Sequence, residues 1–280
     1  MLRPGARANS IAAVLSFFMR AAAPRRDVAL WNLRLALPDE SDEEIRRILR
    51  GTYDHLVWTA IEFLMLQRDP RLALEWADSE NASLLDSLDG RGAILLTGHV
   101  GNWELVAAWL AQRGHRVTAI VQETDDRGMM ERMRSRVGVV SMSKTVPMTR
   151  AAAVLRRGEF LGILPDQHGG HGGVWAPFFG VKTPTSPGAA VFAYLTKKPL
   201  IPIFSHRISP CRHKIRIGGP IEWEACRSRD ETVADITARI NATVERMVLE
   251  APDQWLAQHR RFKEHYGAPR SAEAPSSLSE

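Results

Sequence analysis

Residues 93–104 read AILLTGHVGNWE, and this stretch decides how the chain is to be interpreted. Its four leading apolar residues predict a buried strand, and His99 follows the strand five residues before the carboxylate of Glu104. Glycines at 98 and 101 suit a strand that turns abruptly into a helix where another group approaches closely. Such a histidine and glutamate can act as a general base and its orienting partner. The alternative is a hydrogen-bonded structural histidine, because the spacing H-x4-E is common by chance.

The composition is that of a globular protein, the length suits one large α/β domain or a domain with a helical appendage, and the charge favours an anionic partner. The chain has 280 residues, 45% of them hydrophobic and 25% charged, which is enough for a full core. Its formal net charge of +5 favours phospholipid headgroups, a phosphorylated substrate, an acidic carrier protein or nucleic acid. Two cysteines without metal-site spacing indicate neither a zinc site nor a disulfide framework, so a reducing compartment is the simpler assumption.

The N-terminal segment carries a short apolar run, residues 11–19, flanked by arginines. This run is too short to span a bilayer, which takes roughly 20 apolar residues. A segment lying in the membrane interface fits it better, with the arginines facing anionic lipid headgroups. A short helix that caps the core is the alternative.

The pattern along the chain predicts a helical N-terminal portion, residues 1–80, followed by an α/β domain, residues 81–267, and a disordered tail, residues 268–280. A good N-cap and helical spacing of apolar residues predict a long helix over residues 41–67. Beyond it, strands are expected at 93–97, 117–121, 160–164, 200–204 and 213–217. Helices are expected at 102–113, 127–135, 149–157, 187–197 and 231–250. Short apolar strands that alternate with helices predict a mixed, largely parallel sheet covered by helices.

Polar residues follow two of these strands. His99 comes after the strand at 93–97, and Asp166 and Gln167 come after the strand at 160–164. Ligands of open α/β sheets gather at the carboxyl ends of the strands, so we expect these residues at one site. The glycine-rich stretch at 169–173 lacks the ending of a phosphate-binding loop, and we expect no nucleotide or nucleic acid there.

Four segments in register carry a resemblance to a known family. They are GHVGNWE at 98–104, LPDQ at 164–167, PFFG at 177–180 and HRRFK at 259–263. In this order they resemble the bacterial lipid A biosynthesis acyltransferases, the lauroyl and myristoyl transferases of the lysophospholipid acyltransferase superfamily. The resemblance extends from about residue 26 to residue 263. The N-terminus departs from it, because many members carry a longer hydrophobic anchor there.

The resemblance implies transfer of a fatty acyl group to a hydroxyl of a membrane lipid at the cytoplasmic face of the inner membrane. The acyl donor would be a thioester of acyl carrier protein or coenzyme A, and no cofactor is implied. The histidine and acidic residue of the family fall on His99 and Glu104, and its Asp-Gln block falls on Asp166 and Gln167.

The chemistry can also be argued from the residues. An alcohol is a poor nucleophile at neutral pH, so His99 would accept its proton as it attacks the thioester carbonyl. Glu104 would hold the imidazole tautomer and stabilise the imidazolium. The acceptor hydroxyl then takes the place of a serine, which predicts a ternary complex and no acyl-enzyme.

Further candidates have less specific roles. Asn102, or backbone amides from Gly98 to Asn102, would stabilise the oxyanion, while a helix cap is the alternative for Asn102. Arg136 is the choice among three arginines for a phosphate of the acceptor or of the carrier's phosphopantetheine arm, against a solvated helix face. Asp166 would otherwise be a turn or cap residue, and Thr185 caps a helix or faces the site.

Two more groups of polar residues have alternative interpretations. Asp166, His168 and His171 match no strong zinc pattern, so no metal site is expected. The basic group at 259–263 would neutralise a helix C-terminus, or it would face lipid headgroups or an acidic carrier protein.

Other functions remain open from sequence. The same chemistry would serve a lysophospholipid, an aminolipid or a mannosylated phosphoinositide, because the matched motifs serve the reaction and not the headgroup. A thioesterase that uses water and an inactive membrane-binding homologue are further alternatives.

Overall fold

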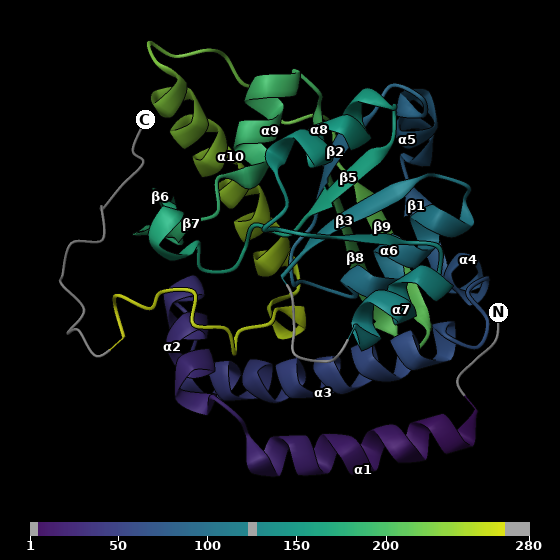
Figure 1. Cartoon of the computed structure of the whole chain (residues 1–280). Coiled ribbons are helices and arrows are strands. Elements are labelled where there is room, and N and C mark those ends of the chain that lie inside the picture. Colours follow the sequence, from purple (N-terminus) through teal and green to yellow (C-terminus); the bar gives the residue numbers. More distant parts are fainter. Residues whose placement is uncertain (1–4, 123–127, 267–280) are drawn as a thin grey trace.

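The computed structural model describes residues 5–122 and 128–266. The predicted tail at 268–280 therefore lies outside the described residues. Helices α1 to α4 come first, followed by an α/β region that ends in the long helix α10 (Figure 1). The helices are α1 (Ala6–Ala22), α2 (Arg26–Ala36), α3 (Asp42–Leu66), α4 (Leu72–Trp76), α5 (Ala82–Leu88), α6 (Trp103–Gln112), α7 (Met129–Arg136), α8 (Met148–Arg156), α9 (Gly188–Thr196) and α10 (Arg229–Glu250).

Seven strands of the described chain form one mixed sheet, in the order β1-β9-β8-β2-β5-β3-β4. Strands β8 and β9 pair antiparallel, and the other neighbours pair parallel. Two further strands, β6 and β7, form a separate antiparallel hairpin. The strands are β1 (Ala77–Glu80), β2 (Ala93–Leu96), β3 (Val117–Val121), β4 (Val140–Ser143), β5 (Phe160–Ile163), β6 (Val174–Phe178), β7 (Val181–Thr185), β8 (Leu200–Ser209) and β9 (Arg212–Ile217).

The structure confirms the predicted fold class of an α/β chain with a mixed, largely parallel sheet. The five expected strands are β2, β3, β5, β8 and β9, while sequence analysis missed β1, β4 and the β6–β7 hairpin. The missed strands have mixed, partly exposed patterns. Strand β1 starts at Ala77 and belongs to the sheet, so the sheet begins before the end of the stretch expected to be helical.

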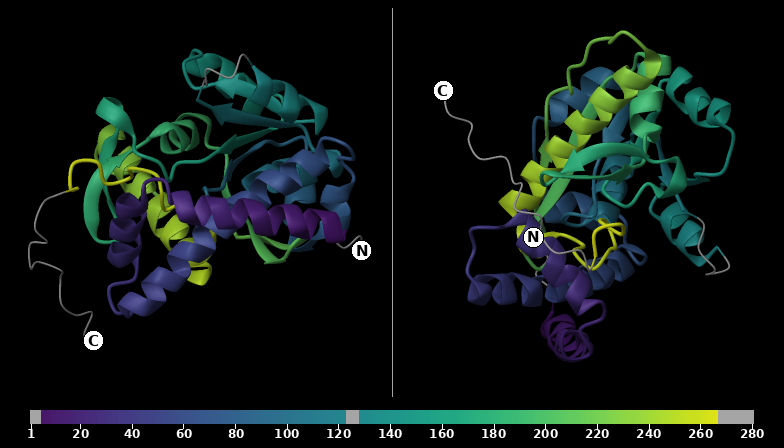
Figure 2. Two further views of the ribbon diagram at one scale, coloured as in Figure 1. Left: turned by 90° about the horizontal axis from the view of Figure 1, so that it is seen from below. Right: turned by 90° about the vertical axis from the view of Figure 1, so that its left-hand side faces the viewer.

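Alternation along the central strands assigns their side chains to two cores. Leu95 of β2 and Phe160 of β5 pack with α4, α5 and α6, whereas Leu96 and Leu161 pack with α8, α9 and α10. A buried strand in a parallel sheet must be apolar on both faces, which explains the continuous run at 93–96. The two helical layers on either side of the sheet are visible in Figure 2.

A third core joins the N-terminal helices to the C-terminal segment. It contains Leu33 of α2, Ile45 of α3, Val244 of α10 and Trp255 after α10. Helix α1 lies on the far side of α3 from the sheet in Figures 1 and 2. No helix within the described ranges 5–122 and 128–266 is long and apolar enough to cross a membrane.

Candidate active site

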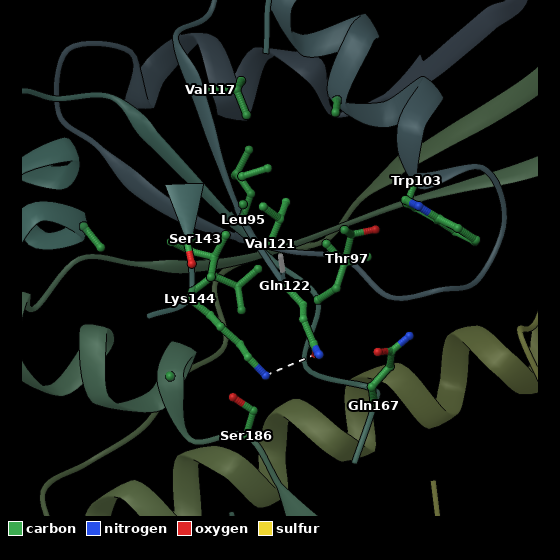
Figure 3. A pocket seen from close by; sticks show the side chains of 18 of the residues that line it. Leu95, Thr97, Trp103, Val117, Val121, Gln122, Ser143, Lys144, Gln167 and Ser186 are labelled. Atoms are coloured by element: carbon green, nitrogen blue, oxygen red, sulfur yellow. Dashed lines mark hydrogen bonds between the residues drawn. The ribbon is translucent and has the colours of Figure 1, made fainter. Parts of the chain in front are cut away.

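A cavity of about 640 Å³ lies at the carboxyl ends of the central strands. Residues on β2, β3 and β5 line it together with parts of α6, α7, α8 and α9. In Figure 3, Gln167 and Ser186 lie at one end of the drawn side chains and Val117 lies at the other. The position agrees with the expectation that ligands of such sheets bind where the strands end.

The cavity reaches both faces of the sheet. Leu95, Val106 and Leu110 line it and belong to the core under α6. Ile163 and Phe192 also line it and belong to the core on the opposite face. Its walls are therefore largely apolar, and the polar side chain of Gln167 lies beside His99 on the wall.

His99 lies between a buried carboxylate and an amide. Its Nδ1 lies 2.9 Å from Oδ1 of Asp166, and its backbone N–H donates to Oδ2 of the same carboxylate over 2.9 Å. An ionised carboxylate only accepts hydrogen bonds, so Nδ1 carries the proton and Nε2 has a free lone pair. Nε2 lies 3.2 Å from Nε2 of Gln167, which donates to it. His99 and Gln167 both line the cavity.

Asp166 is suited to stay ionised at this site. Burial raises the pKa of its carboxyl, but attraction to His99 and hydrogen bonds from His99 outweigh burial and lower the pKa overall. The side chain of Asp166 is almost fully buried, whereas that of His99 is 18% exposed. Asp166 therefore stabilises a positive imidazole ring without itself contacting solvent.

The structure gives Glu104 a different partner from the one predicted. Its Oε1 accepts from Nη2 of Arg134 over 2.6 Å and its Oε2 accepts from Nε over 3.1 Å, a two-point ion pair on the cavity wall. The expected orienting contact on His99 is made by Asp166 instead. Glu104 is in the first turn of α6, where its carboxylate is directed towards α7 rather than along the strand. Sequence spacing alone does not reveal this direction.

Asn102 is a helix cap in the structure. Its Oδ1 accepts from the N–H of Leu105 over 2.9 Å, and its Nδ2 donates to Glu62 over 2.8 Å. Both side-chain polar groups are thus engaged away from the cavity, and Asn102 is fully buried. Of the two alternatives for this residue, the cap is therefore the one observed.

Two backbone amides of the turn, those of His99 and Gly101, are also engaged. The N–H of His99 donates to Asp166, and the N–H of Gly101 donates to the carbonyl of Gln254 over 2.9 Å. Gly101 has a φ of +65°, and a Cβ there would overlap the carbonyl oxygen of Ser205. Only glycine fits this close approach, which confirms the reason given for it from sequence.

Thr185 and Arg261 form a buried support behind the site. Thr185 is fully buried, and its Oγ1 accepts from Nη2 of Arg261 over 2.6 Å. Arg261 also donates to the carbonyl of Pro184 over 2.7 Å and is 1% exposed. Burial lowers the pKa of Arg261 to about 10. Arg261 therefore does not face lipid or a carrier, which was one of the two alternatives for the basic group at 259–263.

Among the three candidate arginines, Arg134 and not Arg136 lines the cavity. Arg136 is exposed at the C-terminal end of α7. Arg136, the residue selected from sequence, therefore does not line the cavity, and the sequence leaves this choice open because it does not determine the helix phase of α7. A short polar helix offers no apolar stripe from which to read that phase.

An α/β fold in which a histidine paired with a buried carboxylate lines a largely apolar cavity is typical of an enzyme. The chain belongs to the family described as bacterial lipid A biosynthesis acyltransferase, whose pattern matches residues 3–264. It is therefore a member of a family of acyltransferases, as the four sequence segments indicated.

Individual relatives are distant. The chain is 26% identical over 257 residues to the lipid A biosynthesis palmitoleoyltransferase of Escherichia coli, covering 85% of this chain and 79% of that protein. It is 26% identical to the lipid A biosynthesis lauroyltransferase of the same organism, covering 83% and 77%. A phosphatidylinositol mannoside acyltransferase of Mycobacterium tuberculosis is 28% identical over 130 residues, 42% of this chain and 41% of that protein.

Proposed function

We propose that this protein transfers a fatty acyl group from an acyl thioester to a hydroxyl of a lipid A precursor, with His99 as the general base. The observation that carries the proposal is the arrangement of His99, with Nδ1 on buried Asp166 and Nε2 directed at the cavity. Two relatives whose names state lipid A acyl transfer support the choice of acceptor. A related glycolipid, as in the name of the mycobacterial relative, is the alternative acceptor.

The proposed reaction needs no covalent enzyme intermediate. Nε2 of His99 takes the proton of the acceptor hydroxyl as its oxygen attacks the thioester carbonyl. The tetrahedral intermediate collapses, the C–S bond breaks, and the imidazolium returns the proton to the thiolate. An ester and a free thiol result. Asp166 holds the reactive tautomer and stabilises the imidazolium, the role that sequence analysis gave to Glu104.

Gln167 is placed to act in the same step. Its amide occupies the position beside Nε2 of His99 that an attacking hydroxyl must take, so the amide moves aside when the acceptor binds. In the displaced position, the N–H group of Gln167 is suited to donate to the developing oxyanion. The backbone amides of His99 and Gly101 are already engaged in other hydrogen bonds.

The cavity wall suggests where the substrates lie. Its apolar part, under α6, fits the acyl chain. The polar part is lined by two cations, Arg134, which is paired with Glu104, and exposed Lys144. These cations suit a phosphate of the acceptor or of the thioester carrier. Glu104 remains a proposed site residue through its hold on Arg134.

We also propose that the protein works at the cytoplasmic face of the inner membrane and contacts an anionic lipid surface through α1. This helix buries small side chains, Ala12 and Ser16, and exposes large ones. Its exposed large apolar residues are Ile11, Val14, Leu15, Phe17 and Phe18. The exposed arginines Arg7, Arg25 and Arg26 lie at its two ends, where anionic headgroups would meet them.

The direct test follows both products of a long-chain acyl thioester, with and without a lipid A precursor. We expect thiol release and acylated lipid to rise together and only with acceptor present. His99→Ala is expected to remove nearly all transfer while the circular dichroism spectrum stays native. Thiol release that is independent of acceptor would instead identify a thioesterase, and activity retained in His99→Ala would reject the assigned base.

A further inference from the structure

A buried polar cluster lies behind the turn that carries His99, on the side opposite the cavity. Its centre is Glu62 of α3, which is fully buried. The carboxylate accepts from Nη2 of Arg207 over 2.7 Å, from Nε2 of His213 over 3.1 Å and from the N–H of Cys211 over 2.9 Å. These contacts come from β8, β9 and the turn between them, so Glu62 connects α3 to the β8–β9 hairpin of the sheet.

The same carboxylate reaches the active-site turn. Oε2 of Glu62 accepts from Nδ2 of Asn102 over 2.8 Å, and Asn102 caps α6 three residues after His99. About two turns earlier on α3, Nε2 of His55 lies 3.0 Å from the carbonyl oxygen of Gly101. Two side chains of α3 therefore hold two consecutive residues of the turn.

The hydrogen bonds fix which groups donate. A carbonyl only accepts, so Nε2 of His55 carries its proton, and its Nδ1 accepts from the guanidinium of Arg207. Likewise Nε2 of His213 donates to Glu62, and its Nδ1 accepts from the hydroxyl of Ser205 over 2.9 Å. Both histidines are thus satisfied as neutral rings.

Electrostatics agree with this assignment. Burial lowers the pKa of His55 well below its ordinary value, with Arg207 adding to the effect, and burial also lowers the pKa of His213. For Glu62, burial raises the pKa, but the charge of Arg207 and hydrogen bonds from Arg207 and His213 reverse this, and the net pKa is lowered. Glu62 is the buried anion of the cluster and Arg207 is its buried cation. Each of them is hydrogen-bonded to the other and to further groups of the cluster.

Stability does not require such a cluster. A buried ion pair contributes weakly to stability compared with an apolar core of the same shape, because both charges lose hydration. A buried network instead fixes orientation, because all of its hydrogen bonds are made in only one arrangement of the side chains. In this cluster the hydrogen bonds fix the positions of Gly101 and Asn102, which follow His99 by two and three residues.

We propose that Glu62 and His55 are positioning residues that fix the His99 turn, so that Nε2 of the base faces the cavity in a single orientation. The proposal rests on His99 being the base of the proposed acyl transfer. Neither residue touches the cavity, and both act through the turn. Substitution of either residue is therefore expected to lower kcat and to change KM little.

Asn102→Ser tests this link with little change in the helix. Serine is as good an N-cap as asparagine, so the N–H of Leu105 keeps its acceptor, but the donor to Glu62 is lost. We expect kcat to fall at least tenfold while KM changes less than threefold. Glu62→Gln, which removes the charge, is expected to act in the same direction and more strongly, while Glu62→Asp restores part of the loss.

A stability-matched control separates positioning from general loosening. Ser228 caps α10, far along the chain from the turn, through the N–H of Glu231. Ser228→Ala is expected to lower the melting temperature and leave kcat unchanged. A kcat of folded Asn102→Ser within twofold of wild type would overturn the proposal, even where Glu62→Gln fails to fold.

Nuclear magnetic resonance gives a readout that does not depend on turnover. The proton on Nδ1 of His99 is bonded to a buried carboxylate and should resonate far downfield, and His99→Gln assigns it. We expect this signal to broaden or shift in Asn102→Ser. An unchanged signal would contradict positioning, whereas a wild-type protein that shows the signal but no acyl transfer would reject the proposed function alone.

Discussion

At the scale of residues, the site depends on which carboxylate contacts His99, the proposed base. Sequence spacing favours Glu104, because it follows His99 on the same chain segment within one helical turn. The structure brings Asp166 from the neighbouring strand β5 to Nδ1 of His99 and gives Glu104 to Arg134. The physical reason is that β2 and β5 are adjacent parallel strands whose carboxyl ends meet, while the side chain of Glu104 is directed sideways by α6.

Comparing Asp166→Asn with Glu104→Gln distinguishes the two carboxylates. An asparagine at 166 offers only one acceptor for two N–H donors of His99 and can hold the wrong tautomer, so kcat should fall about 10³-fold. Glu104→Gln frees Arg134 without touching His99, so a loss of about tenfold is expected. Steady-state kinetics on both folded variants are the measurement. A greater kcat loss in Glu104→Gln would return the orienting role to Glu104.

At the scale of elements, one row of residues across the sheet makes room for the cavity. Gly162 of β5 lies between Leu95 of β2 and Ala119 of β3 in the register. Phe160, two residues earlier on the same face of β5, fills the core under α6, whereas Gly162 leaves its place empty. The cavity under α6 therefore exists because small side chains stand where a core strand normally carries large ones.

Gly162→Val should shorten the acyl chain that the protein accepts. A Cβ at 162 has no neighbour closer than 3.9 Å, so the new side chain fits the backbone and enters the cavity. Each buried methylene contributes about 0.8 kcal/mol, so excluding two costs about 1.6 kcal/mol, or roughly fifteenfold in kcat/KM. Competition between long and short acyl thioesters measures this, and the short donor is the internal control. An unchanged preference would place the acyl chain elsewhere.

At the scale of the whole molecule, α1 differs from a core helix because its small side chains are buried and its large apolar side chains are exposed. Its buried positions hold alanine and serine against α3, and an ion pair between Arg20 and Asp54 adds to the contact. Phe17 and Phe18 are each 62% exposed. An exposed apolar face flanked by basic residues is typical of a helix that lies in a membrane interface.

Replacing both Phe17 and Phe18 with aspartate should weaken binding to vesicles that contain phosphatidylglycerol. Loss of two partly inserted rings is expected to cost about 3 kcal/mol, or roughly a hundredfold in the partition coefficient. Vesicle flotation measures binding, and Leu249→Asp, at an exposed position on α10, is the matched control. Equal binding of the double variant and wild type would rule out α1 as the lipid contact.

The sequence alone was sufficient to predict the fold class and the five central strands, and to place His99 at the carboxyl end of β2, while the role of His99 as the base stays a prediction. It could do so because strands buried on both faces are continuous apolar runs, and because parallel strands place their carboxyl ends at one edge. Polar residues on the buried face of α3, at 55, 59 and 62, were a signal of the cluster behind the turn that sequence analysis did not use. A polar side chain at a core position needs a partner, and such a position marks a network.

Only the tertiary structure decided which partners these residues have. The pairing of His99 with Asp166, of Glu104 with Arg134 and of Asn102 with Glu62 joins segments between 30 and 67 residues apart. Local patterns carry no information on such distances, because the direction of a side chain depends on how whole elements pack. Sequence therefore shows which chemical groups are available, and packing determines which of them lie in contact.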